Sequence, residues 1–254
     1  MQNNTFSGLF VGQHRVTLSA VDSTNSYLKE ALSNSAPFPE GTVIMAEEQF
    51  AGRGQASNSW ISDPGKNLTF SILLKPVFLQ PSRQFELNKA ISLALNDVLN
   101  GYFPGLARIK WPNDAYIGDK KIAGVLIENM VQGSQIKHCI VGIGLNVNQQ
   151  QYPSELPNAT SFYKILQSDV DLTTVLGEIC SAIERRYLQL RAGNDLTAEY
   201  VSQLYRLRQP ASFRVESQFQ TGTITGITDS GLLEIEIDGI KRQFGLKEVE
   251  FIVP

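Results

Sequence analysis

Two stretches of the chain repeat apolar residues at helical spacing. The first covers residues 85–100 and precedes Gly101, and the second runs from Leu172 to Leu190 and is expected to end near Gly193. Apolar side chains three or four positions apart form one face of a helix, and a glycine just beyond is a common stop signal. Both stretches are predicted to be long amphipathic helices, and a shorter helix is expected to begin within residues 22–26.

Short runs rich in β-branched and aromatic residues lie between these helices, separated by glycine or aspartate turns. They cover residues 42–46, 68–74, 107–110, 115–117, 124–129 and 136–146. Such runs are typical of strands. Because strands and helices interleave, we expect an α+β fold in which helices flank a mixed β-sheet.

The pattern changes after Gln209-Pro210, where no helical spacing remains. Segments 213–216, 221–228, 232–237 and 240–244 are predicted to be successive strands, and Asp238-Gly239 is a strong signal for a two-residue hairpin. We predict two domains, residues 1–207 and 208–254. The second is expected to be a small β-barrel, since closure removes exposed sheet edges.

Composition excludes several classes of protein. With 254 residues, 42% hydrophobic and 19% charged, the chain is not of a disordered or fibrous kind. A net charge of −3 provides no positive field to hold nucleic acid. No apolar run approaches the roughly 20 residues that span a bilayer. We expect a cytoplasmic protein without nucleic-acid or membrane partners, whose Cys139 and Cys180 are reduced core residues.

A glycine-bearing loop follows the predicted strand 42–46. It contains Gly52-Arg53-Gly54, with Gln49 before it and Trp60 after it. Glycines let backbone N–H groups approach a ligand, and a guanidinium offers paired donors to phosphate or carboxylate oxygens. The loop is therefore a candidate anion site, although two glycines in a surface loop more often mark only a turn.

Three further segments carry polar groups or bare backbone next to predicted strands. Residues 110–114, Lys-Trp-Pro-Asn-Asp, bring a lysine, an amide and a carboxylate together, and a solvated turn explains them equally well. Lys121 leads into the strand that contains Gly124, where lysines are usually solvated. Residues 142–146 read Gly-Ile-Gly-Leu-Asn. Glycines at alternate positions leave one face of the strand without side chains, which makes room for a ligand or for a closely packed helix.

The helix start at Ser23-Thr24-Asn25 has more hydroxyl and amide groups than capping requires. The surplus could bind a polar ring. A capped helix start is nevertheless the commoner explanation for such a cluster.

Taken in order, these five motifs strongly resemble those of the biotin protein ligase family, and the Lys-Trp-Pro-Asn-Asp element is the most specific of them. The resemblance covers about half of the chain. It implies a class II synthetase-like catalytic domain followed by an SH3-like barrel. Because only about twenty residues precede Ser23, it points to the class that lacks an N-terminal DNA-binding domain.

The resemblance also implies the reaction and its participants. Biotin is activated by ATP, with Mg²⁺ carried by the nucleotide and not by protein ligands, to biotinyl-5'-adenylate. The biotinyl group then passes to a lysine of a biotin carboxyl carrier protein. Relatives can pair as homodimers, so a homodimer is a further expectation.

Residue roles follow from the same resemblance. The predicted catalytic residues are Arg53, Lys110, Asp114 and Lys121, of which Arg53 and Lys121 neutralise the reacting anions, Lys110 meets the ATP phosphates and Asp114 orients or deprotonates the acceptor lysine. Ser23, Thr24, Asn25 and Gln49 bind the ureido ring, Trp60 covers adenine, Asn146 lies beside the nucleotide, and Gly52, Gly54, Gln55, Asn113 and Gly124 complete the predicted binding set.

The chain departs from the family pattern at one place. The family loop reads Gly-Arg-Gly-Arg, whereas Gln55, Ala56 and Ser57 follow Gly54 here. An amide thus replaces a guanidinium that helps to retain the adenylate. We expect weaker retention of biotinyl-adenylate.

Three other functions compete with this interpretation. A lipoate protein ligase shares the fold and the adenylation chemistry but lacks the Lys-Trp-Pro-Asn-Asp element. A biotin-responsive repressor requires a DNA-binding domain. A non-catalytic biotin-binding relative would not need Arg53, Lys110 and Lys121 together, since binding biotin alone requires no cations for phosphate.

Overall fold

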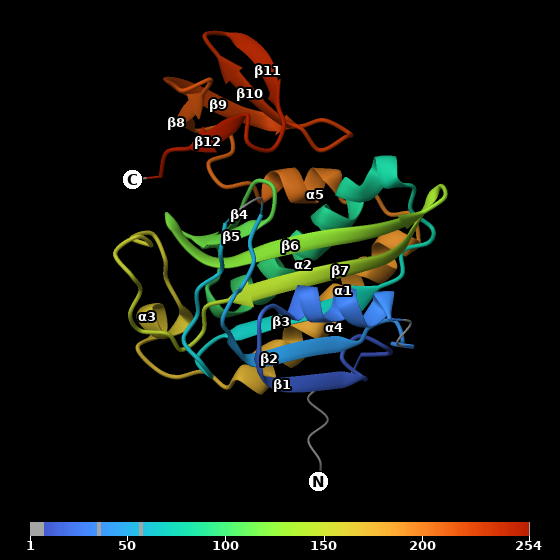
Figure 1. The fold of residues 1–254 in the computed structure, drawn as a ribbon. Coiled ribbons are helices and arrows are strands. Elements are labelled where there is room, and N and C mark those ends of the chain that lie inside the picture. Colours follow the sequence, from blue (N-terminus) through green and yellow to red (C-terminus); the bar gives the residue numbers. More distant parts are fainter. Residues whose placement is uncertain (1–7, 35–36, 56–57, 254) are drawn as a thin grey trace.

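The larger part of the fold is a seven-stranded mixed sheet with helices on both faces (Figure 1). A computed structural model describes residues 8–34, 37–55 and 58–253. The strand order is β1-β2-β3-β7-β6-β5-β4, and of these neighbours only β1 and β2 are parallel. The strands are β1 (Arg15–Val21), β2 (Val43–Gln49), β3 (Leu68–Leu74), β4 (Ala107–Lys110), β5 (Asp114–Ile117), β6 (Lys120–Gln132) and β7 (Gln135–Leu145).

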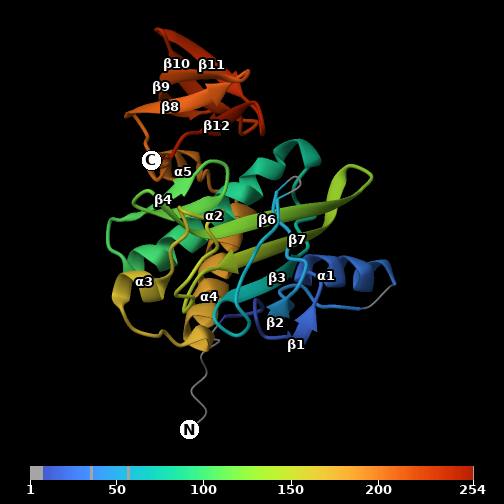
Figure 2. The ribbon, with the colours of Figure 1, turned by 60° about the vertical axis from the view of Figure 1, so that its left-hand side comes forward.

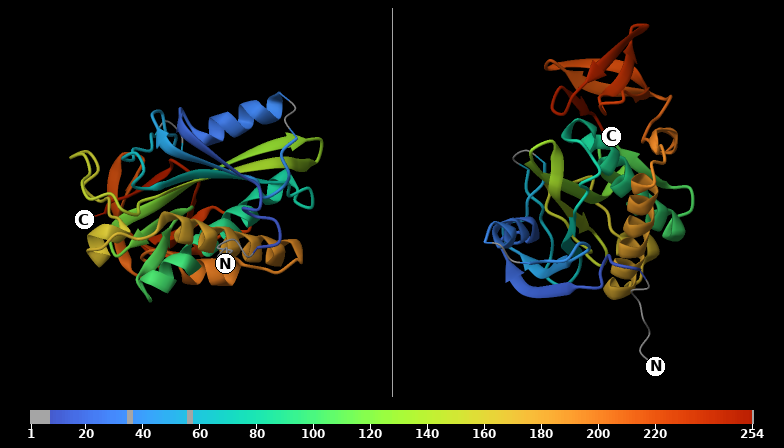
Figure 3. Two further views of the ribbon diagram at one scale, coloured as in Figure 1. Left: turned by 90° about the horizontal axis from the view of Figure 1, so that it is seen from below. Right: turned by 90° about the vertical axis from the view of Figure 1, so that its right-hand side faces the viewer.

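Helices cover the two sheet faces unequally. The long helices α2 (Gln84–Tyr102) and α4 (Leu172–Arg191) lie on one face, and α1 (Thr24–Ser33) lies on the other (Figure 3). Side chains alternate between faces along a strand. In the buried strand β3, Ile72 therefore belongs to the large core over α2 and α4, while Leu73 joins Leu28 of α1 in a smaller core.

The C-terminal part forms a separate five-stranded antiparallel sheet in the order β11-β10-β9-β8-β12 (Figure 2). Its hairpin at Asp238-Gly239 has φ angles of 53° and 76°, as a two-residue turn requires. The α+β class and the SH3-like second sheet are confirmed, while the boundary between 207 and 208 stays a prediction. The strands are β8 (Pro210–Val215), β9 (Gln218–Ile227), β10 (Leu233–Ile237), β11 (Ile240–Phe244) and β12 (Val249–Phe251).

Several sequence expectations need correction. The stop at Gly101 was wrong, because α2 continues to Tyr102 and nothing crowds that glycine. Strand β6 runs well beyond the predicted 124–129. The edge strand β1 was missed because none of its side chains is fully buried, and the terminal strand β12 was missed because it has only three residues. The short helices η1 (Pro81–Arg83), α3 (Phe162–Leu166) and α5 (Thr197–Ser202) were missed too.

Other predictions are confirmed or unchanged. Cys139 and Cys180 are both free and buried. No helix among the described residues is long and apolar enough to cross a membrane.

Candidate active site

A cavity lies on the α1 face of the sheet, and paired glycines form its floor. Across β6 and β7, Gly124 lies opposite Gly144 and Leu126 lies opposite Gly142. A Cβ atom on Gly142 would lie 2.3 Å from Oδ1 of Asn25, and one on Gly144 would lie 2.2 Å from the Trp60 ring. Gly142 thus makes room for the first turn of the closely packed helix α1, and Gly144 makes room for the Trp60 ring.

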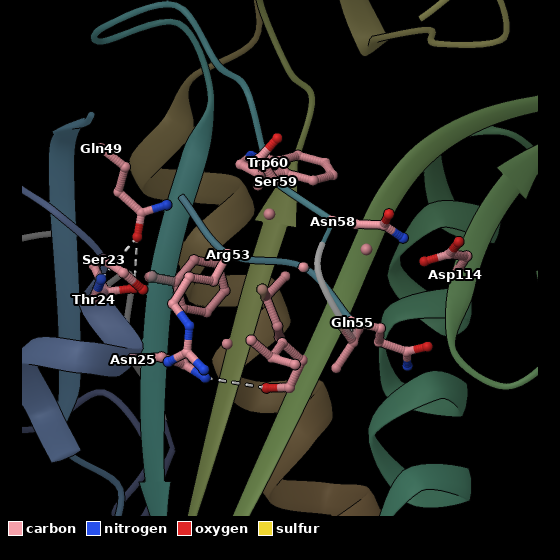
Figure 4. A pocket seen from close by; sticks show the side chains of 18 of the residues that line it. Ser23, Thr24, Asn25, Gln49, Arg53, Gln55, Asn58, Ser59, Trp60 and Asp114 are labelled. Atoms are coloured by element: carbon pink, nitrogen blue, oxygen red, sulfur yellow. Dashed lines mark hydrogen bonds between the residues drawn. The ribbon is translucent and has the colours of Figure 1, made fainter. Parts of the chain in front are cut away.

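The cavity brings together most of the residues that the motifs indicated (Figure 4). One group comes from the start of α1 and the end of β2, and another comes from the glycine loop and strands β5 and β6. The predicted residues that line it are Ser23, Thr24, Asn25, Gln49, Arg53, Gly54, Gln55, Trp60, Asp114, Lys121 and Gly124.

Four predicted residues do not line the cavity. Gly52 lies beneath Trp60, whose carbonyl oxygen would be 2.4 Å from a Cβ atom there. Asn113 and Lys110 belong to the β4–β5 hairpin. Asn146 is buried at the end of β7, where its amide donates to the Thr160 carbonyl and its Oδ1 has no partner among the described residues.

The α1 end of the cavity is a network of buried neutral groups. Ser23 occupies the N-cap position, but its side chain makes no capping hydrogen bond, so the interpretation of this residue as a side-chain cap was wrong. Thr24 donates from its backbone N–H and its hydroxyl to Oε1 of Gln49, at 2.8 Å and 3.1 Å. The Ser71 hydroxyl lies 2.7 Å from that of Thr24 and 2.6 Å from Oδ1 of Asn25.

Glu128 connects this network to Arg53. Its carboxylate accepts from Nδ2 of Asn25 at 2.9 Å and from both terminal nitrogens of Arg53, at 3.1 Å and 3.0 Å. Burial alone would raise the pKa of Glu128, but these hydrogen bonds and the charges of Arg53 and Lys29 lower it overall. The guanidinium is therefore held by a carboxylate at the cavity wall.

The glycine loop folds back on itself over the cavity. The backbone N–H of Gly54 donates to the Asn58 carbonyl at 2.7 Å, and that of Trp60 donates to the Gly52 carbonyl at 2.9 Å. The side chain of Gln55 donates to Oδ1 of Asn113 at 2.8 Å and so ties the loop to the β4–β5 hairpin. Ala56 and Ser57 lie outside the described residues.

Two lysines flank Asp114 at the other end of the cavity. The ammonium of Lys121 lies 2.7 Å from Oδ2 of Asp114, and both side chains are partly exposed. Lys110 pairs with Asp114 in the β4–β5 register. Burial lowers the pKa of Lys110, as does the charge of Lys121, while the charges of Asp114 and Glu250 oppose the shift.

The half-buried side chain of Trp60 carries a buried, unpaired donor atom. Its Nε1 has no hydrogen-bond partner among the described residues, although the ring lies against Gly144 in the cavity. Buried polar groups are normally paired. A ligand atom that accepts from this nitrogen would satisfy it.

Sequence reasoning missed two residues that organise the site, Ser71 and Glu128. Glu128 was readable in principle from strand alternation, because it shares a face with Gly124 along β6, whereas Ser71 is recognised only from its register opposite Gly142. Among the described residues, no group of three or more His, Cys, Asp or Glu side chains could hold a metal ion.

Comparisons with known proteins agree with this geometry. Residues 18–146 match the model of the biotin/lipoate A/B protein ligase family. The chain is 33% identical over 242 residues to the bifunctional ligase/repressor BirA of Bacillus subtilis, covering 91% of this chain and 72% of that one. It is 30% identical over 224 residues to the biotin–[acetyl-CoA-carboxylase] ligase of Paracoccus denitrificans, covering 85% and 91%.

A solved structure is similar over nearly the whole chain. It is the biotin protein ligase from Aquifex aeolicus in complex with biotin and ATP, with a TM-score of 0.79, 28% identity and coverage of 95% of this chain and 100% of that one. The family resemblance noted from the five motifs is thereby confirmed. The chain belongs to the biotin/lipoate A/B protein ligase family.

Proposed function

We propose that this protein is a biotin protein ligase that forms biotinyl-5'-adenylate from biotin and ATP and transfers the biotinyl group to a lysine of a biotin carboxyl carrier protein. The observation that carries the proposal is one cavity with two unlike ends. Neutral polar groups lie at the α1 end with Arg53 beside them, and the partly exposed Lys121 lies at the other end. A substrate with a polar ring and a carboxylate suits that arrangement.

In the first step, a carboxylate oxygen of biotin attacks the α-phosphorus of ATP and pyrophosphate leaves. Both reactants are anions and repel each other. Arg53 and Lys121 are the cations in the cavity wall that are suited to neutralise them. Mg²⁺ would enter with the ATP phosphates.

In the second step, the acceptor lysine attacks the carbonyl carbon of the mixed anhydride, an amide forms, and AMP and a proton are released. The amine must be deprotonated to react. Asp114 lies in the cavity wall, 2.7 Å from Lys121, where it is suited to orient the incoming amine.

The ring end supports biotin over a linear acyl chain. Ser23, Thr24, Asn25 and Gln49 present hydroxyl and amide groups, which complement the donors and acceptors of a ureido ring. The Ser23 hydroxyl has no hydrogen bond within the described residues and is available to a ligand. A hydrocarbon chain would leave the Ser23 hydroxyl unpaired, at a cost of about 1–3 kcal/mol.

The test is exchange of labelled pyrophosphate into ATP, because it isolates adenylation from the carrier. We expect exchange that depends on biotin and is not supported by lipoate or octanoate at equal concentration. Exchange driven by lipoate would make the protein a lipoate ligase. Binding of biotin without any exchange would make it a non-catalytic relative.

A further inference from the structure

The ammonium of Lys110 lies between two aromatic rings that belong to different sheets. It is 5.4 Å from the ring centroid of Tyr116, in β5, and 5.1 Å from that of Phe251, in β12. Both distances are within the range of a cation–π contact. Within the described residues, this ammonium has no hydrogen bond or ion pair, so the rings hold the charge without neutralising it.

The Phe251 ring is itself fixed within the C-terminal sheet. It packs edge-on against Phe213, with ring centroids 5.2 Å apart, and β12 pairs with β8 at this point. Phe213 is fully buried. The aromatic face that meets Lys110 is therefore held by the core of the second sheet.

A second contact holds the same hairpin from the C-terminal part. The indole Nε1 of Trp111 donates to the carbonyl of Gly231 at 3.0 Å. Gly231 lies so close to the Phe85 ring that a Cβ atom would be 2.2 Å from it. Residues 110 and 111 are thus both held by the C-terminal sheet, while Asp114 of the same hairpin lines the cavity.

We propose that Phe251 is a positioning residue, which aims the ammonium of Lys110 at the phosphates of ATP. The inference rests on the proposed function. An aromatic face suits this task better than a carboxylate, because it orients the cation without competing with the phosphates for its charge. The C-terminal sheet would then contribute to nucleotide binding through a residue that does not itself touch the nucleotide.

The test compares Phe251→Leu with Phe251→Tyr in the full chain. Titration of an ATP analogue with an α,β-methylene bridge, at saturating biotin, gives the nucleotide Kd, and a separate titration gives the biotin Kd. We expect Phe251→Leu to raise the nucleotide Kd about three- to tenfold and to leave the biotin Kd unchanged. Phe251→Tyr keeps the ring and should restore the wild-type value.

Phe219→Leu is the matched control. Phe219 is an exposed aromatic of the same sheet, and its ring stacks on Arg214 at 5.1 Å, away from the cavity. Its replacement should change neither Kd. In a Lys110→Met background, Phe251→Leu should produce no further rise in the nucleotide Kd, since the two residues act as a unit.

Three results would overturn the inference, of which two concern the nucleotide Kd alone. One is an unchanged nucleotide Kd in Phe251→Leu, and the other is an equal rise in the Lys110→Met background. Parallel weakening of nucleotide and biotin binding would likewise indicate a purely structural role. Wild-type protein that shows no biotin-dependent exchange would refute the proposed function and is distinguishable from all of these.

Discussion

The two ends of the cavity differ in how their polar groups are held. At the α1 end, Ser23, Thr24 and Asn25 are each only 3% exposed, and Ser71 is fully buried beneath them. At the other end, the side chain of Lys121 is 34% exposed, while the Arg53 side chain, which lies beside the α1 network near Ser26 and Glu128, is 42% exposed. One end is a network of polar groups that already hydrogen-bond to one another and are carried by a helix and strands. The other is the partly exposed ion pair of Lys121 with Asp114, carried by β6 and β5.

The difference follows from the cost of burying charge. Neutral donors and acceptors that pair with one another can be desolvated during folding at little cost. An unpaired buried cation would be expensive, so Arg53 and Lys121 stay partly hydrated and paired with Glu128 and Asp114. We infer that the α1 end, here called the ring end, is preorganised to select the ring of the substrate. The end with Lys121, here called the phosphate end, is completed by its ligand.

Lys121→Ala tests the phosphate end most directly. We expect the biotin-dependent exchange rate to fall by about two to three orders of magnitude, because a preorganised cation at the reacting anions is lost. Biotin affinity should change little, since the ring end is intact. Pyrophosphate exchange and biotin calorimetry measure the two effects.

Lys120→Ala is the control for that change. Lys120 is the exposed neighbour of Lys121, and its side chain points to the opposite face of β6. It should exchange at the wild-type rate. Equal exchange in Lys121→Ala and Lys120→Ala would remove Lys121 from the mechanism.

Gln55→Arg sharpens the same end by restoring the family's fourth loop residue. One added charge-assisted hydrogen bond contributes roughly 1.5–3 kcal/mol, so release of biotinyl-adenylate should slow by about tenfold or more. A chase with unlabelled biotin after adenylate formation measures the release rate. Gln55→Met removes the 2.8 Å contact to Asn113 without adding charge and serves as the control. Equal release rates in wild type and Gln55→Arg would contradict the expectation.

Ser71→Ala breaks the hydrogen-bonded network at the ring end. It leaves the Thr24 hydroxyl and Oδ1 of Asn25 without their buried donor. We expect the biotin Kd to rise about five- to tenfold and the free energy of unfolding to fall by about 1–3 kcal/mol. Titration calorimetry and urea unfolding measure the two changes.

Ser92→Ala provides a matched control for this substitution. Ser92 is equally buried in α2, but its hydroxyl has no hydrogen-bond partner among the described residues. Removing that hydroxyl should leave biotin binding unchanged and should not lower stability. If both serine variants lost the same stability and neither lost affinity, the ring-end network would not be a biotin site.

Local sequence patterns were sufficient for much of the fold and for most of the cavity wall. The apolar run 68–74 indicates a buried strand, and the glycines at 142 and 144 indicate a close approach of other atoms. In both cases the residue type itself is restricted by what packs against it. Ser71 gave no such signal. A single serine within an apolar strand acquires its meaning only from the register with β7 and from Asn25 above it.

Long-range pairings were beyond prediction for a different reason. The Phe251 ring meets Lys110 across 141 positions of sequence, and no local periodicity connects the two. Glu128 likewise reaches back to Arg53 from another strand. The interpretation of Ser23-Thr24-Asn25 as ordinary capping failed because the competing hydrogen-bond partners come from β2 and β3.

Glu128→Gln produces the smallest expected effect and tests the connection between the α1 network and Arg53. Above the unfolded-state pKa of about 4.3, the ionised carboxylate stabilises the folded protein, because its folded-state pKa is lowered. We expect the substitution to cost about 1 kcal/mol of unfolding free energy at pH 7. The figure is modest because the Arg53 side chain is 42% exposed.

The sign of the pH dependence follows from the lowered pKa. As the pH falls through the folded-state pKa, the wild-type carboxylate becomes protonated, and the stability difference from Glu128→Gln should shrink toward zero. Urea unfolding at pH 7 and at about pH 3.5 measures this stability difference. The buffer should have an ionic strength that screens exposed ion pairs. Glu250→Gln, whose ion pair with Arg214 is exposed on both sides, should change stability by less than about 0.5 kcal/mol at either pH. A difference for Glu128→Gln that stayed constant between the two pH values would mean that the carboxylate charge does not hold Arg53 against the α1 network.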